Sequence, residues 1–193
     1  MDSGAEARLA AEPSRIIELE ERLRELEKRL AYVEGQVAED RVALVVFSGD
    51  LDRVLAAFII ATGAAAMGQQ VSMFFTFWGL SVLKRDKQIA GKTLSQKMMT
   101  LMTAGSSQSL PVSRMNYYGI GAKMLRSMMK DKNVNSLEEM ISLARDLGVR
   151  MVACEMSRDL MGIGESELVG GLESGGVATF LGDSLRARTS LFI

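Results

Sequence analysis

The chain contains a single side chain suited to nucleophilic chemistry near neutral pH, the thiol of Cys154. It is the only cysteine among 193 residues, and the sequence has no histidine. Without an imidazole, Ser-His-Asp and Cys-His machinery are both excluded. One cysteine and scattered carboxylates also do not form a set of metal ligands, so we expect no metal site and no cofactor. If the chain performs covalent chemistry, Cys154 is the first candidate to do it.

The expected position of Cys154 favours a reactive sulfur. It lies at the end of the apolar run VRMVAC, and MSRDLMG shortly after it is predicted to begin a helix. Reactive groups gather at the carboxyl ends of parallel strands, and the amide N–H groups at a helix start favour a thiolate. Other residues expected at the same edge would form the walls of this site: Ser48, Gly49, Asp50, Trp78, Gly79, Ser157, Gly182 and Asp183. The alternative interpretation is that Cys154 is a small buried hydrophobe.

The elements that must position these residues predict an α/β domain over 41–193. Three compact apolar runs have the composition of buried strands: residues 41–47, 70–80 and 149–157. Two stretches have the spacing of helices: residues 52–67 and 135–148. Strands that are apolar on both faces and alternate with helices indicate a three-layer α/β/α fold with a mostly parallel sheet.

Two parts of this domain are less regular. The last unit predicts a strand over 175–183 and then a short helix over 184–188. Residues 84–118 form a long insertion with Gly, Ser and Pro at its centre, and methionines cluster around it. Long irregular connections are often functional, so these methionines are interpreted either as core filling or as an adaptable docking surface.

The apolar stretch over 54–80 raises the question of a membrane span. Gly68, Gln69 and Gln70 interrupt it, and each flank has the length of a core helix or a core strand. We therefore favour a buried helix and strand, and contact with a membrane is the less favoured interpretation.

The amino-terminal part predicts a coiled-coil helix over 15–39, after a disordered segment over 1–14. Apolar residues recur alternately three and four apart, at the a and d positions of a heptad: Ile16, Leu19, Leu23, Leu26, Leu30, Val33 and Val37. The g positions hold arginine and the e positions glutamate: Arg15, Arg22 and Arg29 against Glu20, Glu27 and Glu34. Parallel pairing sets each Arg against a Glu, so a parallel homo-oligomer is favoured over a single helix that folds back on the domain.

The overall composition limits the remaining function classes. Lys and Arg number 23 against 24 Asp and Glu, a net charge of −1, so no general basic field predicts nucleic-acid binding. One cysteine forms no disulfide within the chain, and the first residues do not resemble a signal peptide. These features predict a cytoplasmic protein.

Several stretches in succession resemble the DsrE/DsrF/DsrH-like family, in its larger, methionine-rich branch. They are GDLDRVLAAFIIATGAAAMG, FFTFWGL, MNYYGIGAKMLRSMMKDKNV, SLEEMISLARDLGVRMVACEMSRDLMGI and GGVATFLGDS. The resemblance implies a three-layer α/β fold, a tendency to oligomerise, and sulfur trafficking through a cysteine persulfide. It places the sulfur-accepting cysteine on Cys154, and it implies donor or acceptor proteins such as a rhodanese or a TusA-like carrier.

Two other functions stay open from the residues themselves. The chain could be an oligomeric binding or scaffold module without chemistry, or a thiol redox sensor that forms sulfenic acid or a disulfide between subunits. Nucleotide binding is the weakest alternative, because SGD and GIGAKM match neither a P-loop nor a dinucleotide fingerprint.

Overall fold

The structure is a computed structural model that describes residues 3–34, 37–85, 88–89 and 91–193. It divides into two compact units, Met1–Val37 and Ala38–Ile193. Helix α1 (Ser3–Glu34) makes up the first unit. It begins at Ser3 and so includes residues 3–14, for which we expected disorder. That stretch is rich in alanine, the strongest helix former. Residues 1–2 and 35–36 lie outside the described part.

The second unit is built on a parallel sheet. Its strands are β1 (Glu39–Val46), β2 (Gln70–Phe75), β3 (Arg150–Cys154), β4 (Glu173–Gly175) and β5 (Ala187–Phe192). Their order is β4-β3-β2-β1-β5, and every neighbouring pair is parallel. The predicted α/β fold with a mostly parallel sheet is confirmed.

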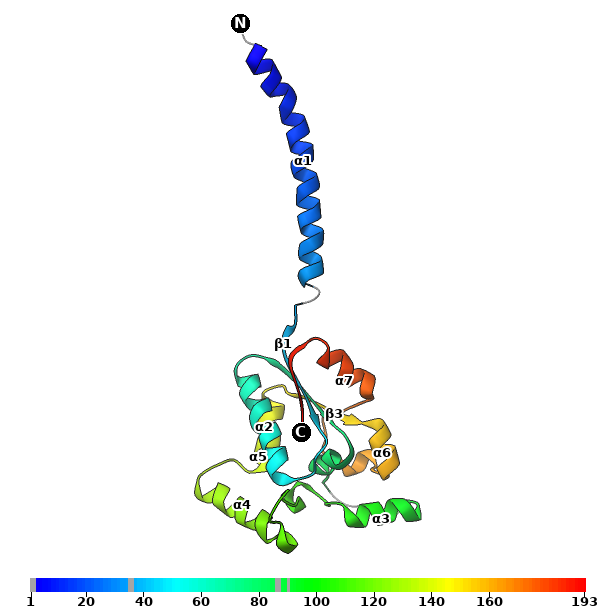
Figure 1. Cartoon of the computed structure of the whole chain (residues 1–193). Helices are drawn as coiled ribbons and strands as arrows, with labels where there is room; N and C mark the ends of the chain where they lie inside the picture. The colour runs from blue at the N-terminus through cyan, green and yellow to red at the C-terminus, as the bar shows by residue number, and fades with distance from the viewer. Residues whose placement is uncertain (1–2, 35–36, 86–87, 90) are drawn as a thin grey trace. The chain divides into compact units, whose positions relative to one another are not determined.

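Helices cover both faces of this sheet (Figure 1). One face packs against α2 (Leu51–Ala66) and α5 (Leu137–Asp146) and holds most of the hydrophobic core, including Leu44 and Met73. The other face packs against α6 (Glu155–Met161) and α7 (Val177–Ser184). Ser136 caps α5 as predicted, because its Oγ accepts a hydrogen bond from the Glu139 N–H.

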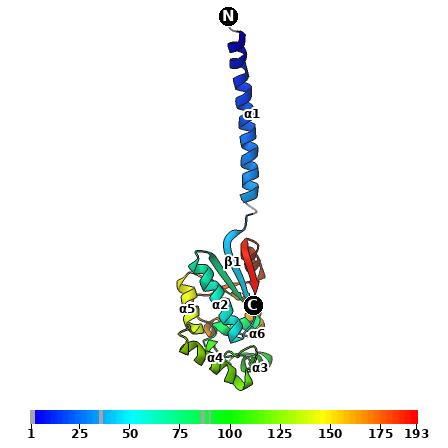
Figure 2. The same cartoon turned by 60° about the vertical axis from the view of Figure 1, so that its left-hand side comes forward.

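The insertion after β2 lies beyond the carboxyl ends of the strands. It contains η1 (Phe77–Leu83), α3 (Leu94–Met102), η2 (Ser107–Ser109), η3 (Tyr117–Gly119) and α4 (Ile120–Asp131). Two views place α3 and α4 at the same end of the domain (Figures 1 and 2).

Hydrogen bonds join the insertion to the start of α2. The Leu51 N–H donates to Pro111 O at 2.7 Å. Burial opposes ionisation of Asp52, but the hydroxyl and N–H of Ser113 donate to it and hold the pKa of that carboxyl below its usual range.

Several predicted boundaries were wrong. The predicted third strand extends to Ser157, but β3 ends at Cys154 and α6 begins at Glu155. The predicted second strand extends to Leu80, but β2 ends at Phe75 and η1 follows. Residues 177–183 of the predicted last strand belong to α7. The predicted helix over 184–188 is instead the end of α7, a turn and the start of β5. The cause is β5's place at the sheet edge, where its exposed positions carry polar residues and no apolar run forms. No helix in the described ranges is long and apolar enough to span a membrane.

Candidate functional site

Cys154 is the last residue of β3, and α6 begins at the next residue. This is the strand-end position that the sequence pattern predicted. The residue is buried, with 4% of its surface exposed. Its Sγ accepts a hydrogen bond from Ser157 Oγ at 3.4 Å, and Ser157 itself is fully buried. Ser157, predicted as part of the site wall, therefore contacts the sulfur directly.

A second hydroxyl extends this contact. Thr76 Oγ1 lies 2.8 Å from Ser157 Oγ, in a hydrogen bond that either atom could donate. Ser157 has one hydroxyl proton, so when it donates to Cys154 the proton between the two hydroxyls comes from Thr76. The result is a directed chain from Thr76 through Ser157 to the sulfur. A chain that ends with a donor at Sγ suits a sulfur that carries negative charge.

Aromatic side chains cover the cysteine on the face of the sheet that α7 packs against. Cys154 belongs to a small cluster with Phe74 and Val152, and the partly buried Phe180 of α7 packs against that cluster. The rings of Phe74 and Phe180 are 5.7 Å apart. Phe180 therefore forms part of the cover over the cluster that contains the thiol.

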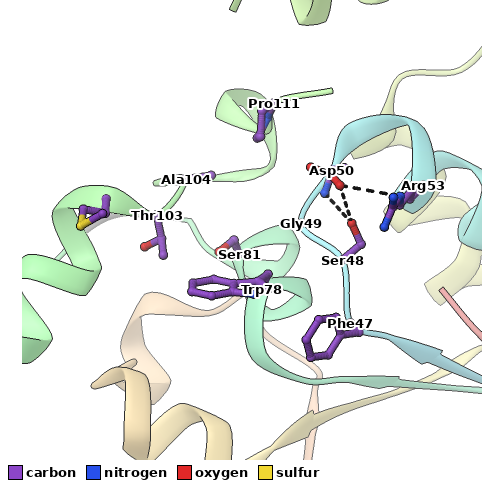
Figure 3. A pocket seen from close by; sticks show the side chains of 11 residues that line it. Phe47, Ser48, Gly49, Asp50, Arg53, Trp78, Ser81, Thr103, Ala104 and Pro111 are labelled. Carbon is purple, nitrogen blue, oxygen red and sulfur yellow. Dashed lines mark hydrogen bonds and ion pairs between the residues drawn. The ribbon is translucent and has the colours of Figure 1, made fainter. Parts of the chain in front are cut away.

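Four of the predicted wall residues line one cleft of about 290 Å³ at the carboxyl ends of β1 and β2: Ser48, Gly49, Asp50 and Trp78. Figure 3 shows Trp78 near Thr103 on one side of the cleft and the turn from Ser48 to Asp50 on the other. Ser48 donates to the Asp50 carboxylate at 3.0 Å. Cys154 and Ser157 are not among the residues that line this cleft. The sequence therefore correctly predicted that the cleft residues and the pair Cys154 and Ser157 lie at the same edge of the sheet. It did not predict that the cleft and the thiol are separate.

Residues 76–79 connect the two groups. Thr76, which contacts Ser157, donates its N–H to Val46 O at 3.1 Å. Gly79 donates to Phe47 O at 2.9 Å, and a Cβ at position 79 would lie 2.0 Å from Val46 O. Only glycine allows this close approach. The segment that forms one wall of the cleft is thus fixed at its start to the hydroxyl chain that reaches Cys154.

Gly182 and Asp183 were wrongly predicted to lie at this edge. Asp183 contacts Arg41 and Arg150, each at 2.6 Å, and these arginines lie near the starts of β1 and β3. The pair therefore sits at the amino ends of the strands, opposite Cys154. The error follows from the last unit, because residues 177–184 form a helix instead of a strand and so return the chain to the other edge.

Two residues of the site were not singled out from the sequence. Thr76 had a usable signal, because it is a hydroxyl residue inside the apolar run FFTFWGL, directly after a strand. Phe180 had none, since its segment was interpreted as a strand. Within the residues that the structure describes, no group of three or more His, Cys, Asp or Glu side chains is placed to hold a metal ion.

The comparison with protein families gives one match that covers most of the chain. Residues 38–192 match the DsrE/DsrF/DrsH-like family. This range coincides closely with the second compact unit, Ala38–Ile193, and leaves α1 outside. It also contains Cys154, Ser157 and Thr76.

The chain is also similar to individual proteins. The protein YrkE of Bacillus subtilis (strain 168) is 40% identical over 154 residues, which cover 79% of this chain and 96% of YrkE. The sulfur carrier protein DsrE2 of Allochromatium vinosum is 34% identical over 145 residues, 74% of this chain and 91% of DsrE2. Among solved structures, the ychN protein from E. coli covers 79% of this chain and 98% of its own, with 11% identity and a TM-score of 0.45. The chain belongs to the DsrE/DsrF/DrsH-like family.

Proposed function

We propose that the chain carries sulfane sulfur as a persulfide on Cys154 and passes it to a partner protein. One observation carries the proposal. The chain's only cysteine lies at the carboxyl end of β3 and accepts a hydrogen bond from a buried hydroxyl. Family membership supports it, because a relative at 34% identity is named a sulfur carrier protein.

The transfer needs only the groups that the site contains. The Cys154 thiolate attacks the outer sulfur of a donor persulfide, R–S–SH, so that Cys154–S–SH forms and the donor leaves as its thiolate. An acceptor thiolate then attacks the outer sulfur of Cys154–S–SH, which forms the acceptor persulfide and restores the Cys154 thiolate. Each step exchanges one S–S bond for another, so no external oxidant or reductant is consumed. The chemistry belongs in the cytoplasm, where thiols stay reduced.

The hydroxyl chain has a role at both ends of this cycle. Cys154 carries negative charge before sulfur arrives and again after it leaves. Ser157 can donate to the sulfur in both states, and Thr76 keeps the Ser157 oxygen satisfied while it does so. The Ser157 hydroxyl is held in place by α6, so it needs no reorganisation when negative charge develops on the sulfur. A hydrogen-bond donor positioned in advance stabilises such charge most effectively.

Burial of Cys154 sets a condition on the transfer. A protein partner has to bring its own sulfur to within bonding distance of a residue that exposes 4% of its surface. Phe180 packs against the cluster around the thiol from α7. We infer that Phe180 moves aside when donor or acceptor binds, and that the closed position protects the persulfide between the two transfers.

An adaptable apolar surface lies beside the thiol. Helix α6 starts directly after Cys154 and exposes Met156 and Leu160, and α3 packs against α6. Three residues of α3 are between 62% and 78% exposed: Met98, Leu101 and Met102. Methionine fits partners of different shape, which suits a carrier that must dock a donor and then an acceptor, such as a rhodanese and a TusA-like protein.

Intact-mass spectrometry of the full chain tests the proposal. The protein is measured before and after treatment with polysulfide, or with thiosulfate and a rhodanese, beside Cys154→Ser. The expected result is additions of single sulfur atoms on the unmodified chain, removed by reductant and absent from the variant. If the folded chain gains no sulfur although Cys154 reacts once unfolded, the scaffold interpretation replaces the carrier.

Peroxide treatment of the same two proteins distinguishes the redox-sensor alternative from the sulfur carrier. A sensor would form a disulfide between two chains through Cys154 under peroxide, visible as a crosslinked dimer on a non-reducing gel. The burial of Cys154 disfavours this bond, because two buried sulfurs on separate chains do not approach each other without local unfolding. A carrier should gain sulfur and stay uncrosslinked.

A further inference from the structure

Helix α1 carries an apolar stripe that is exposed to solvent. The a and d residues of its heptads are between 54% and 64% exposed: Ile16, Leu19, Leu23, Leu26, Leu30 and Val33. A helix with one exposed narrow seam of this length is marginal by itself in water, because most helical stability comes from burying such a face. The seam is therefore a surface that another element covers.

The charges beside the seam identify what covers it. The g positions Arg15, Arg22 and Arg29 and the e positions Glu20, Glu27 and Glu34 flank it on opposite sides. In a parallel pair of identical helices, each g residue faces the e residue of the partner's next heptad, so every such contact joins Arg to Glu. An antiparallel pair would oppose Arg to Arg and Glu to Glu, which is unfavourable. The seam is thus complementary to itself in one orientation.

We propose that α1 pairs in parallel and in register with α1 of a second copy of this chain. The alternative partners for these charges are weak. Arg22 and Arg29 form exposed pairs within the helix, with Glu18 at 3.5 Å and Glu25 at 3.0 Å, and such i,i+4 pairs leave the apolar seam uncovered. The matched family range begins at residue 38, so this interface belongs to a segment that the family match does not describe. The proposal is independent of sulfur transfer.

The single native cysteine makes a direct test practical. In a Cys154→Ser background, Leu19→Cys places one thiol at a d position near the start of the seam, and Glu21→Cys places it at the outer f position. Under mild oxidation at micromolar protein, parallel in-register pairing brings two Leu19→Cys thiols together. We expect disulfide-linked dimer to form at least about tenfold faster in Leu19→Cys than in Glu21→Cys.

Charge reversal provides a second, independent measurement on the full chain. The triple variant Arg15→Glu, Arg22→Glu, Arg29→Glu has only acids beside the seam. The triple variant Glu20→Arg, Glu27→Arg, Glu34→Arg has only bases there. Each alone should lose the Leu19→Cys crosslink, and their mixture should recover it as a heterodimer, because every g–e′ contact is then attractive. Equal crosslinking of Leu19→Cys and Glu21→Cys, or no recovery in the mixture, would overturn the proposal whatever the mass of the unmodified protein in solution.

Discussion

The insertion that carries α3 is fixed by a buried ion pair, and the cost of breaking it can be worked out. Lys92 Nζ lies 2.8 Å from Glu167 Oε1, and the two side chains are 8% and 1% exposed. Glu167 also accepts the N–H groups of Gly164 and Gln88. Burial raises the pKa of the Glu167 carboxyl, but the hydrogen bonds from Lys92 and from the two backbone N–H groups outweigh it and hold that pKa below its usual range.

Lys92→Met removes the cation and keeps most of the apolar stem. The Glu167 carboxylate would then be buried without a counter-charge, which costs about 3–5 kcal/mol. This is a large share of the roughly 5–15 kcal/mol that typically stabilises a domain. Urea unfolding, followed by the fluorescence of the single tryptophan, Trp78, measures the loss at pH 7. The matched control is Lys97→Met, on the same insertion and without a described ion pair.

The effect of pH gives a sharper check. In the unmodified chain the folded pKa of Glu167 is below its unfolded value of about 4.3, so its stabilisation is present above that value and is lost as the pH falls through the folded pKa. Without Lys92, burial should raise the folded pKa above about 4.3, and protonation would relieve the buried charge. The stability difference between the two proteins should therefore shrink as the pH falls from 7 toward 4.

Two results would refute this reasoning. The first is a loss below about 1 kcal/mol at pH 7, the size typical of an exposed ion pair. The second is a stability difference that stays constant between pH 7 and pH 4. The double variant Lys92→Met, Glu167→Gln tests the cause, because it removes the unpaired charge and should recover part of the loss.

The remaining predictions concern the thiol. Phe180→Ala should raise the iodoacetamide labelling rate of folded Cys154 about tenfold, equivalent to about 1.4 kcal/mol of local opening free energy; an unchanged rate would show that α7 does not control access. Ser157→Ala leaves the buried Thr76 hydroxyl without its partner, so it should cost about 1–3 kcal/mol in urea unfolding and slow sulfur loading in the mass assay, whereas exposed Ser166→Ala should change neither.

The sequence was most informative where burial is complete. The runs over 41–47 and 149–157 were predicted as strands, and β1 and β3 lie within or across them, because both faces of these strands are covered and full burial leaves a continuous apolar run. It was least informative at the sheet edge. There the strand ARTSLF exposes Arg188, Thr189 and Ser190, so its sequence has no apolar run. The preceding segment VATFLGDS begins with a short apolar run, so it was interpreted as a strand although it forms a helix.

The site shows the same division. Cys154, Asp50 and Trp78 were placed at one edge of the sheet correctly, although the predicted second and third strands extended past the observed ends of β2 and β3. Which of them touch depends on side-chain directions and loop paths that no short pattern encodes. Thr76 contacts Ser157, which lies 81 positions away in the chain, and Phe180 packs against the cluster that contains Cys154 from a helix that was interpreted as a strand.

The pairing of β1 with β5 has a consequence for the order of events during synthesis. These strands are the first and the last of the five along the chain, and in the sheet β1 lies between β2 and β5. The sheet is incomplete until residues 187–192 have left the ribosome, whereas α1 emerges before any strand does. Helices of nascent chains on one messenger RNA would therefore be available to each other while their domains are still unfolded, which favours assembly of copies made from the same transcript.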